Sequence, residues 1–303
     1  MTTRVEQDER ALVAGPRATG TSPGSGRGDG HGSGPGPSRA RFTRLPWRGR
    51  RPSVVFEIVL ILSGYWLYSM IRNGVPVKVG VATERARQLF DFEHTIGLAI
   101  EKPVNAAADK ITWLVAGTNY YYATLHFIVT VGVLVWMWHS HPGRYRPLRR
   151  VLYLTNMVAL LGFWLFPLAP PRFLEGEGFI DTVVKHGTWG SWASADVASY
   201  SNQYAAMPSM HCAWALWCGL TVATLARRRW VKVLGIAYPA ATAFVVVATG
   251  NHFVLDIFGG YVALGLAFVA QRLLFRRRAL PVRQRTGAGS AVGADRAATS
   301  ATA

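Results

Sequence analysis

Apolar runs long enough to cross a bilayer recur along the middle of the chain. A membrane-spanning α-helix needs about 20 mainly apolar residues, and six segments meet this requirement. Four of the six contain no Asp, Glu, Lys or Arg. The pattern therefore predicts an all-α integral membrane protein built as a bundle of six transmembrane helices. The expected spans are Val54–Ile71, Asn119–Trp138, Val151–Ala169, Ala205–Ala226, Val233–Thr249 and His252–Phe275.

The two ends of the chain differ in composition from the middle. Between Gly15 and Gly36 most residues are Gly, Pro, Ser or Thr, and Ala, Gly, Thr and Arg dominate near the C-terminus. Such stretches cannot bury enough apolar surface to offset the entropy lost when the backbone is ordered. We therefore expect a disordered tail at 1–53, a membrane domain at 54–276 and a second disordered tail at 277–303.

Composition supports a membrane location and accounts for the charge. Half of the residues are hydrophobic and only 16% are charged, against about 25% in ordinary soluble domains. A net charge of +17 is typical of nucleic-acid binding, but here the charge is sorted by position. Twenty-five basic and five acidic residues lie in the chain ends and in the connections 139–150 and 227–232. Only eight basic residues, against nine acidic ones, lie in the connections 72–118 and 170–204.

This charge distribution predicts the topology. Lys and Arg accumulate in cytoplasmic loops, so we expect a multi-pass protein of the plasma membrane with both termini in the cytoplasm. The Arg-rich tails would contact anionic lipids of the inner leaflet, and no nucleic-acid partner is expected. Cys212 and Cys218 are six residues apart on one expected helix, so they face different directions and cannot pair. The chain has no disulfide framework and no zinc-binding spacing.

Polar residues gather at the expected outer ends of three spans. In this topology the fourth and sixth spans begin at the outer face, where the positive end of a helix favours an anion such as phosphate. Pro208 suits the first turn of the fourth span, and Ser209 and His211 would lie beside it. Ser209 could offer a hydroxyl group to a phosphate, and Arg172, which follows the third span, could offer a planar fork of donors.

A His–Asp pair completes this group. His252 and Asp256 are four residues apart, a spacing that places both side chains on one face of a helix. A carboxylate there can hold one imidazole nitrogen protonated and leave the other free as a nucleophile. Structural interpretations also exist, since a membrane His can simply join two helices and Arg172 can anchor a span at the headgroups. Ionisable residues at membrane depth are nevertheless functional candidates.

Two motifs in these spans resemble a known family. Pro-Ser-Met-His at 208–211 and Asn-His-Phe-Val-Leu-Asp at 251–256 resemble the last two signature motifs of the type-2 phosphatidic acid phosphatase superfamily. The resemblance covers roughly 55–275 and is closest to the inositolphosphotransferase branch, which includes inositol phosphorylceramide synthases. Further similarity to that branch lies in Glu84-Arg85, Asn119–Tyr122, His126 and Pro170-Pro171-Arg172.

The resemblance implies a mechanism at the extracytoplasmic face. His252 would attack the phosphorus of a membrane lipid phosphate and form a phosphohistidine, Asp256 would orient it, and His211 would protonate the leaving oxygen. Water, a polyol or a lipid alcohol would then accept the phosphoryl group, and neither a metal nor another cofactor is expected. The family's Lys-x6-Arg-Pro motif is absent, and Val245-Val246 stands where a Ser-Arg pair is expected. We therefore expect Arg172 to replace part of the missing phosphate clamp.

Other residues could bind the substrate or its acceptor. Asn119, Tyr122 and His126 lie at the outer half of the second span, and Asn251 precedes His252. An interfacial aromatic belt is an equally good interpretation of the tyrosines. The segment Glu84–Lys110 mixes apolar and charged residues; it could lie along the interface and guide a lipid, or simply connect two spans.

Other function classes compete with a hydrolase. The enzyme could be a dedicated transferase of an inositol-phosphate-type headgroup. A non-enzymatic haem carrier could use His211 and His252 as ligands, which an absorption spectrum would test. A transporter typically has internal repeats, and none is visible here. A metallohydrolase based on His252 and Asp256 lacks a convincing further set of ligands.

Overall fold

The computed structural model describes part of the chain, namely residues 51–74, 79–188, 202–276 and 279–280. Every described residue belongs to one compact unit of the chain. The expected disordered tails, 1–53 and 277–303, lie almost entirely outside the described residues.

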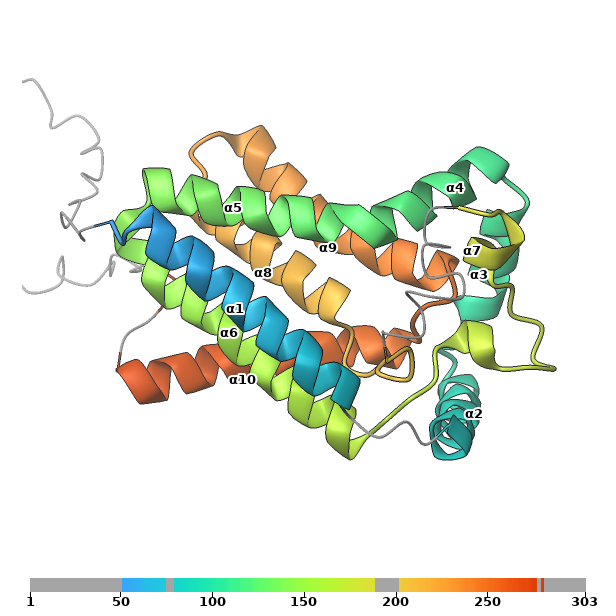
Figure 1. Ribbon diagram of the computed structural model, residues 1–303. Coiled ribbons are helices and arrows are strands. Elements are labelled where there is room, and N and C mark those ends of the chain that lie inside the picture. The colour runs from blue at the N-terminus through green and yellow to red at the C-terminus, as the bar shows by residue number, and fades with distance from the viewer. Residues whose placement is uncertain (1–50, 75–78, 189–201, 277–278, 281–303) are drawn as a thin grey trace, which may run out of the picture. The chain divides into compact units, whose positions relative to one another are not determined.

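The described residues form helices and turns (Figure 1). One isolated bridge joins Leu168 to Ala205. A π-helical turn at Tyr121–Leu125 joins the helices Thr112–Tyr120 and His126–Ser140 without a break. The α-helices are α1 (Val54–Gly74), α2 (Val79–Thr95), α3 (Glu101–Asp109), α4 (Thr112–Tyr120), α5 (His126–Ser140), α6 (Pro142–Leu165), α7 (Thr182–Lys185), α8 (Met210–Leu225), α9 (Arg229–Ala248) and α10 (Val254–Phe275).

Five helical stretches in the described part of the chain are long and apolar enough to cross a membrane. They are α1, α6, α9, α10 and the continuous stretch Thr112–Ser140. Helix α8 is apolar but has only 16 residues, so the fourth expected span, Ala205–Ala226, stays a prediction. The described part of the chain is thus all-helical and has helices suited to crossing a membrane, as the apolar runs predicted.

Helix boundaries differ from the sequence-based expectation at α6. The connection expected at 139–150 is largely helical, because α6 begins at Pro142 and carries the four arginines on its first turns. Proline is favoured at the first position of a helix, where its missing N–H is no loss. Both prolines of this segment, Pro142 and Pro147, are accommodated near the start of α6.

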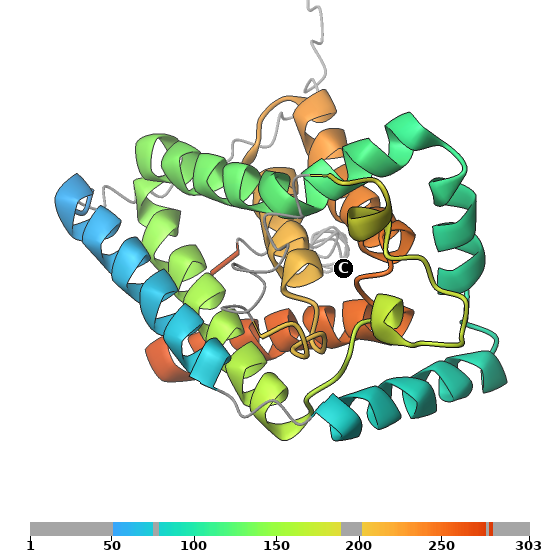
Figure 2. The same cartoon turned by 45° about the vertical axis from the view of Figure 1, so that its right-hand side comes forward.

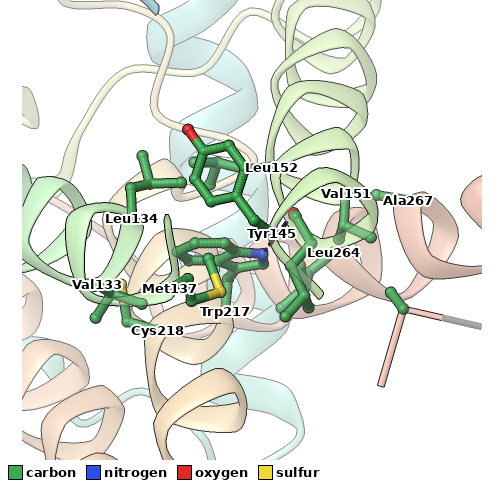
Figure 3. Packing of buried hydrophobic residues seen from close by; sticks show 12 residues of the cluster. Val133, Leu134, Met137, Tyr145, Val151, Leu152, Trp217, Cys218, Leu264 and Ala267 are labelled. Carbon is green, nitrogen blue, oxygen red and sulfur yellow. Dashed lines mark hydrogen bonds between the residues drawn. The ribbon is translucent and has the colours of Figure 1, made fainter. Parts of the chain in front are cut away.

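The centre of the bundle is an apolar cluster around Trp217 of α8 (Figure 3). Its indole Nε1 donates a hydrogen bond to the carbonyl oxygen of Leu148 at 3.0 Å, so the ring's one polar atom is satisfied. Met137, Tyr145 and Leu264 contribute to the same buried cluster from three other helices. These contacts hold α5, α6 and α10 around α8.

Close approaches at glycine bring α8 against its neighbour α9. A Cβ atom added at Gly219 would lie 2.5 Å from the carbonyl oxygen of Gly235. Small residues allow helix backbones to come this close, which is how membrane helices gain van der Waals contact. Helix α1 is held differently: its buried Glu57 accepts hydrogen bonds from Tyr145 and Arg149 of α6, while most of its other side chains are exposed.

The two ends of the bundle differ in chemistry. Figure 1 shows the start of α1, the end of α5, the start of α6 and the end of α10 at one end. There Arg51 donates to the carbonyl oxygen of His139 at 3.0 Å, and the guanidinium of Arg150 lies 4.1 Å from the ring centroid of Phe275. The starts of α8 and α10 lie at the opposite end (Figure 1), and the candidate site lies with them.

Candidate functional site

A cavity of about 650 Å³ lies among the starts of α8 and α10, the end of α1 and the π-helical turn. This volume is within the range of about 300–1,000 Å³ that small-molecule sites occupy. Aromatic side chains, including Phe127, Phe163, Phe173 and Trp214, form much of the wall. The polar lining includes Arg72, Asn119, Tyr122, His126, Arg172, Asp181, Gln203, His211, Asn251 and His252.

His211 lies in the first turn of α8, as expected. Ser209 is the N-cap of this helix, and its hydroxyl oxygen accepts from the backbone N–H of Cys212 at 3.5 Å. Ser209 is fully buried and is not part of the cavity wall, so capping is the role that its contacts define. The expected position of Pro208 in the first helical turn is wrong, because α8 begins at Met210.

His252 and Asp256 meet across the start of α10. The expectation that both lie on the helix is wrong for His252, which precedes it, whereas Asp256 is its third residue. The His252 Nδ1 and Asp256 Oδ2 atoms are 3.3 Å apart. The same oxygen accepts from the backbone N–H of Phe253 at 3.0 Å, so the side chain caps the helix and fixes the imidazole in one arrangement.

The starts of α8 and α10 are tied directly to each other. The backbone N–H of Ser209 donates to the carbonyl oxygen of Asp256 at 2.9 Å. The two helices approach so closely here that a Cβ atom on Gly260 would lie 2.3 Å from the Ser209 carbonyl oxygen. As a result, the ring centroids of His211 and His252 are 6.0 Å apart.

The π-helical turn supplies the surroundings of His211. The Tyr122 ring stacks on the imidazole with centroids 4.0 Å apart, and the His126 ring lies edge-on at 4.2 Å. His126 Nδ1 is 3.1 Å from the carbonyl oxygen of Tyr122. Single π-helical turns inside α-helices occur frequently at functional sites, and here one brings both predicted residues to the cavity.

Arg172 is attached to the His252 turn through its backbone. Its N–H donates to the carbonyl oxygen of Gly250 at 3.0 Å. The guanidinium donates to Gln203 Oε1 at 3.0 Å and lies 3.4 Å from Asp181 Oδ2. The structure therefore brings the expected arginine to the same cavity wall as the two histidines.

Gly250 permits this connection. Its φ of +65° is in the left-handed region, which favours glycine because other residues meet a steric penalty there. A Cβ atom would also lie 3.4 Å from the Arg172 Cβ and 3.5 Å from Asn105 Nδ2. Asn105 itself donates to the carbonyl oxygen of Ala248 at 2.9 Å and so supports the same turn.

Asn105 belongs to a polar face of α3 that sequence reasoning missed. Glu101, Asn105 and Asp109 are spaced by four residues, so they line one side of the helix. Asp109 accepts from Lys185 Nζ at 2.6 Å and is 2.9 Å from His186 Nε2. The hydrogen bonds from Lys185 and then His186 hold the pKa of Asp109 below its ordinary value.

Two predicted substrate-binding amides make internal contacts. The Asn119 amide nitrogen donates to the Thr182 carbonyl oxygen at 3.1 Å and to Thr188 Oγ1 at 2.8 Å, and its oxygen accepts from Thr182 Oγ1 at 2.9 Å. Asn251 donates to Thr249 Oγ1 at 2.7 Å. Both residues line the cavity, but the amide of Asn119 is already engaged in holding α7 against α4.

Other residues at or near the site differ from the sequence-based selection. Arg72 and Gln203 line the cavity and were not selected; the available signal was a basic residue at the end of the first span. Arg85, which the family resemblance included, instead donates to the carbonyl oxygen of Leu165 at 3.3 Å and lies on the Phe166 ring. Among the described residues, no group of three His, Cys, Asp or Glu side chains could hold a metal ion.

Comparison with known proteins gives one match. A family model described as the PAP2 superfamily matches residues 87–270. This range includes the second half of α2, all of α3 to α9 and most of α10, and therefore every predicted catalytic residue. No curated protein and no solved structure matches the chain.

Proposed function

The chain belongs to the PAP2 superfamily, and we propose that it is a membrane phosphatase or phosphotransferase that acts on a lipid phosphate ester through His252. Membership supports the phosphatase or phosphotransferase type of function. The observation that carries the residue assignment is the placement of His211, His252 and Arg172 on the wall of one cavity. Its aromatic lining suits the apolar part of a lipid.

In the proposed first step, the His252 Nε2 lone pair attacks the phosphorus. A proton on Nδ1, donated toward Asp256 Oδ2, keeps Nε2 free. The bond between phosphorus and the lipid oxygen breaks, and His211 gives that oxygen a proton. The products are a lipid alcohol and a phosphohistidine at His252.

In the proposed second step, His211 acts as the general base. It removes a proton from water or an alcohol, whose oxygen attacks the phosphorus while the bond to His252 breaks. Both histidines then return to their starting states. Stacking on Tyr122 supports this role because it limits the orientations that the His211 ring can take.

Two arginines are proposed to clamp the phosphate. Arg172 and Arg72 line the cavity from different segments of the chain, and guanidinium groups bind phosphate oxygens in pairs. The pair would replace the basic motifs of the family that the sequence lacks. Arg72 lies outside the range that the family model matches.

The acceptor distinguishes a hydrolase from a transferase. Tyr122, His126 and Asn251 line the same cavity as the histidines, which supports binding of a polyol beside the phosphohistidine. We propose on this basis that the site also transfers an inositol-phosphate-type headgroup. His252 would attack the phosphorus of an inositol-bearing lipid, the lipid alcohol would leave with a proton from His211, and a second lipid alcohol would take the headgroup from His252. The polar tyrosine and amide groups are the ones that would recognise its hydroxyls.

We place the site on the extracytoplasmic face of the plasma membrane, with both termini in the cytoplasm. The basic residues around Arg51 and Arg150 lie at the other end of the bundle, which supports this orientation because cytoplasmic ends are enriched in Arg. Labelling of single cysteines introduced at each end with an impermeant reagent would test it.

The function is tested with full-length protein purified in detergent and supplied with phosphatidate. We expect release of inorganic phosphate, and formation of a phosphorylated product when inositol or glycerol is added in excess. His252→Ala should abolish both reactions, whereas His139→Ala, at the opposite end of the bundle, should retain them. Equal activity in the two variants would contradict the proposal.

A further inference from the structure

Three carboxylates converge on the first turn of α10. Asp256 Oδ2 accepts from the backbone N–H of Phe253, as described above. Glu101 Oε1 of α3 accepts from the N–H of Val254 at 2.8 Å, and Glu93 Oε1 of α2 accepts from the N–H of Leu255 at 2.6 Å. Three consecutive N–H groups, which the helix itself leaves without partners, are thus each bound by a carboxylate.

Two of these carboxylates come from outside the bundle core. Figure 2 shows α2 and α3, in teal and blue-green, near the start of α10, in orange-red. The side chains of Glu93 and Glu101 are fully buried, and Phe90, on the same helix as Glu93, belongs to one apolar cluster with Phe253. The segment Glu84–Lys110, for which the sequence suggested an interfacial or connecting role, therefore supplies two side chains that bind the start of α10.

The second oxygens of this pair require a proton. With both groups ionised, Glu93 Oε2 and Glu101 Oε2 have no hydrogen-bond partner among the described residues. Leaving such atoms buried and unpaired is costly. One proton held between the two carboxyls satisfies both, and two carboxyls at one buried site commonly titrate this way. Burial first, and then the hydrogen bond with Glu101, raise the pKa of Glu93 from 4.5 to about 9.

We propose that Glu93 and Glu101 share one proton and act as positioning residues that hold the start of α10, so that His252 stays aligned with Asp256. This inference rests on the proposed role of His252. With the proton in place the pair carries one negative charge, which the positive end of α10 stabilises. Neither residue needs to touch the substrate.

Because the shared proton is lost at high pH, the stabilisation that the Glu93–Glu101 pair provides depends on pH. The titratable groups acting on Glu93 are Glu101 from α3 and Asp256 from α10, and both are acidic. A second negative charge among them is repulsive. Because the pKa in the folded state is raised, the stabilisation is complete below the unfolded pKa near 4.5 and is lost as the pH rises through about 9.

The test uses Glu93→Gln and Glu93→Ala, with Glu84→Gln as the matched control. Glutamine can accept from the Leu255 N–H and donate to Glu101, and it has no proton to lose. Glu84 is an exposed residue on the same helix, hydrogen-bonded by Gln88 at 3.1 Å. Thermal unfolding of the full-length protein in detergent is measured from pH 5 to pH 10, together with phosphate release from phosphatidate.

We expect wild type and Glu84→Gln to lose thermal stability and kcat between neutral pH and pH 10. Glu93→Gln should lack this alkaline loss of thermal stability, and Glu93→Ala should lower kcat at least tenfold at neutral pH. Glu101→Gln should also lack the alkaline loss, which keeps the test decisive if the alanine variant does not fold. Parallel unfolding profiles for wild type and both glutamine variants would overturn the proposal. If wild type releases no phosphate, the proposed function fails, but the unfolding profiles still decide the shared proton.

Discussion

The ring of Tyr122 lies against the imidazole of His211, with centroids 4.0 Å apart and planes at 21°. This contact links the π-helical turn to the first turn of α8. It makes an aromatic side chain, which the sequence could assign only to an interfacial belt or to substrate binding, a neighbour of the proposed general acid.

Removal of this ring should impair His211. A stacked aromatic pair contributes about 0.5–1.5 kcal/mol, so Tyr122→Ala should lower kcat by up to about tenfold. Tyr122→Phe keeps the stack and should stay within about threefold of wild type. Steady-state phosphate release measures both. The exposed Tyr120 provides the control, and an equal loss in Tyr120→Ala would mean that stacking on His211 is not the cause.

Arg172→Ala should weaken binding of the lipid phosphate. A hydrogen bond to a charged group contributes about 1.5–3 kcal/mol, so we expect KM to rise by at least about tenfold, and Arg172→Lys should restore little because it cannot form a bidentate pair. Arg72→Ala should act in the same direction. Arg85→Ala is the control, since that guanidinium lies on Phe166 outside the cavity. An unchanged KM in both Arg172→Ala and Arg72→Ala would argue against the clamp.

Gly250→Ala should destabilise the His252 turn. A left-handed conformation costs a residue with a Cβ atom about 1–2 kcal/mol, and the added atom would also meet Arg172 at 3.4 Å. We therefore expect a lower Tm and lower activity. Gly265→Ala is the comparison, because nothing lies within 4 Å of that position and alanine favours a helix interior. A Tm loss in Gly265→Ala as large as in Gly250→Ala would exclude the turn as the cause.

The contacts of Asp109 with Lys185 and His186, which hold the end of α7, should weaken at low pH. Lys185 and His186 lower the pKa of Asp109, so its stabilising effect is present above the unfolded pKa and is lost as the pH falls through the folded one. Hydrogen-exchange protection factors in 182–188, corrected for the intrinsic exchange rate, should therefore fall at low pH in wild type. Asp109→Asn should exchange rapidly at neutral pH as well, whereas Glu175→Gln, an exposed change on the same connection, should resemble wild type. Slow exchange in Asp109→Asn would contradict this role.

Much of the membrane fold could be predicted because a span requires a long apolar run. Periodicity does not define helix ends well, so α6 began earlier and α8 later than expected. For His252 the spacing to Asp256 was informative although the helix begins after the histidine. A capping carboxylate reaches back from the third helical position and produces the same contact.

The buried polar residues that hold the start of α10 and the His252 turn could not be predicted from apolar runs. Glu93, Glu101 and Asn105 lie on short amphipathic helices, where charged residues are normally solvated. Their burial depends on partners more than 70 residues away in sequence, such as Leu255 for Glu93 and Ile180 for Asn105. The four-residue spacing from Glu101 to Asp109 was the only local signal, and it has many structural explanations.

The central claim is that His252 carries the phosphoryl group. Wild-type protein is mixed with phosphatidate labelled with ³²P in its phosphate group, quenched in alkali and digested, and the labelled peptide is identified. We predict an alkali-stable, acid-labile label on the peptide that contains His252, absent from His252→Ala and present in His139→Ala. Phosphate release by wild type without any label on that peptide, or an undiminished label in His252→Ala, would contradict the account.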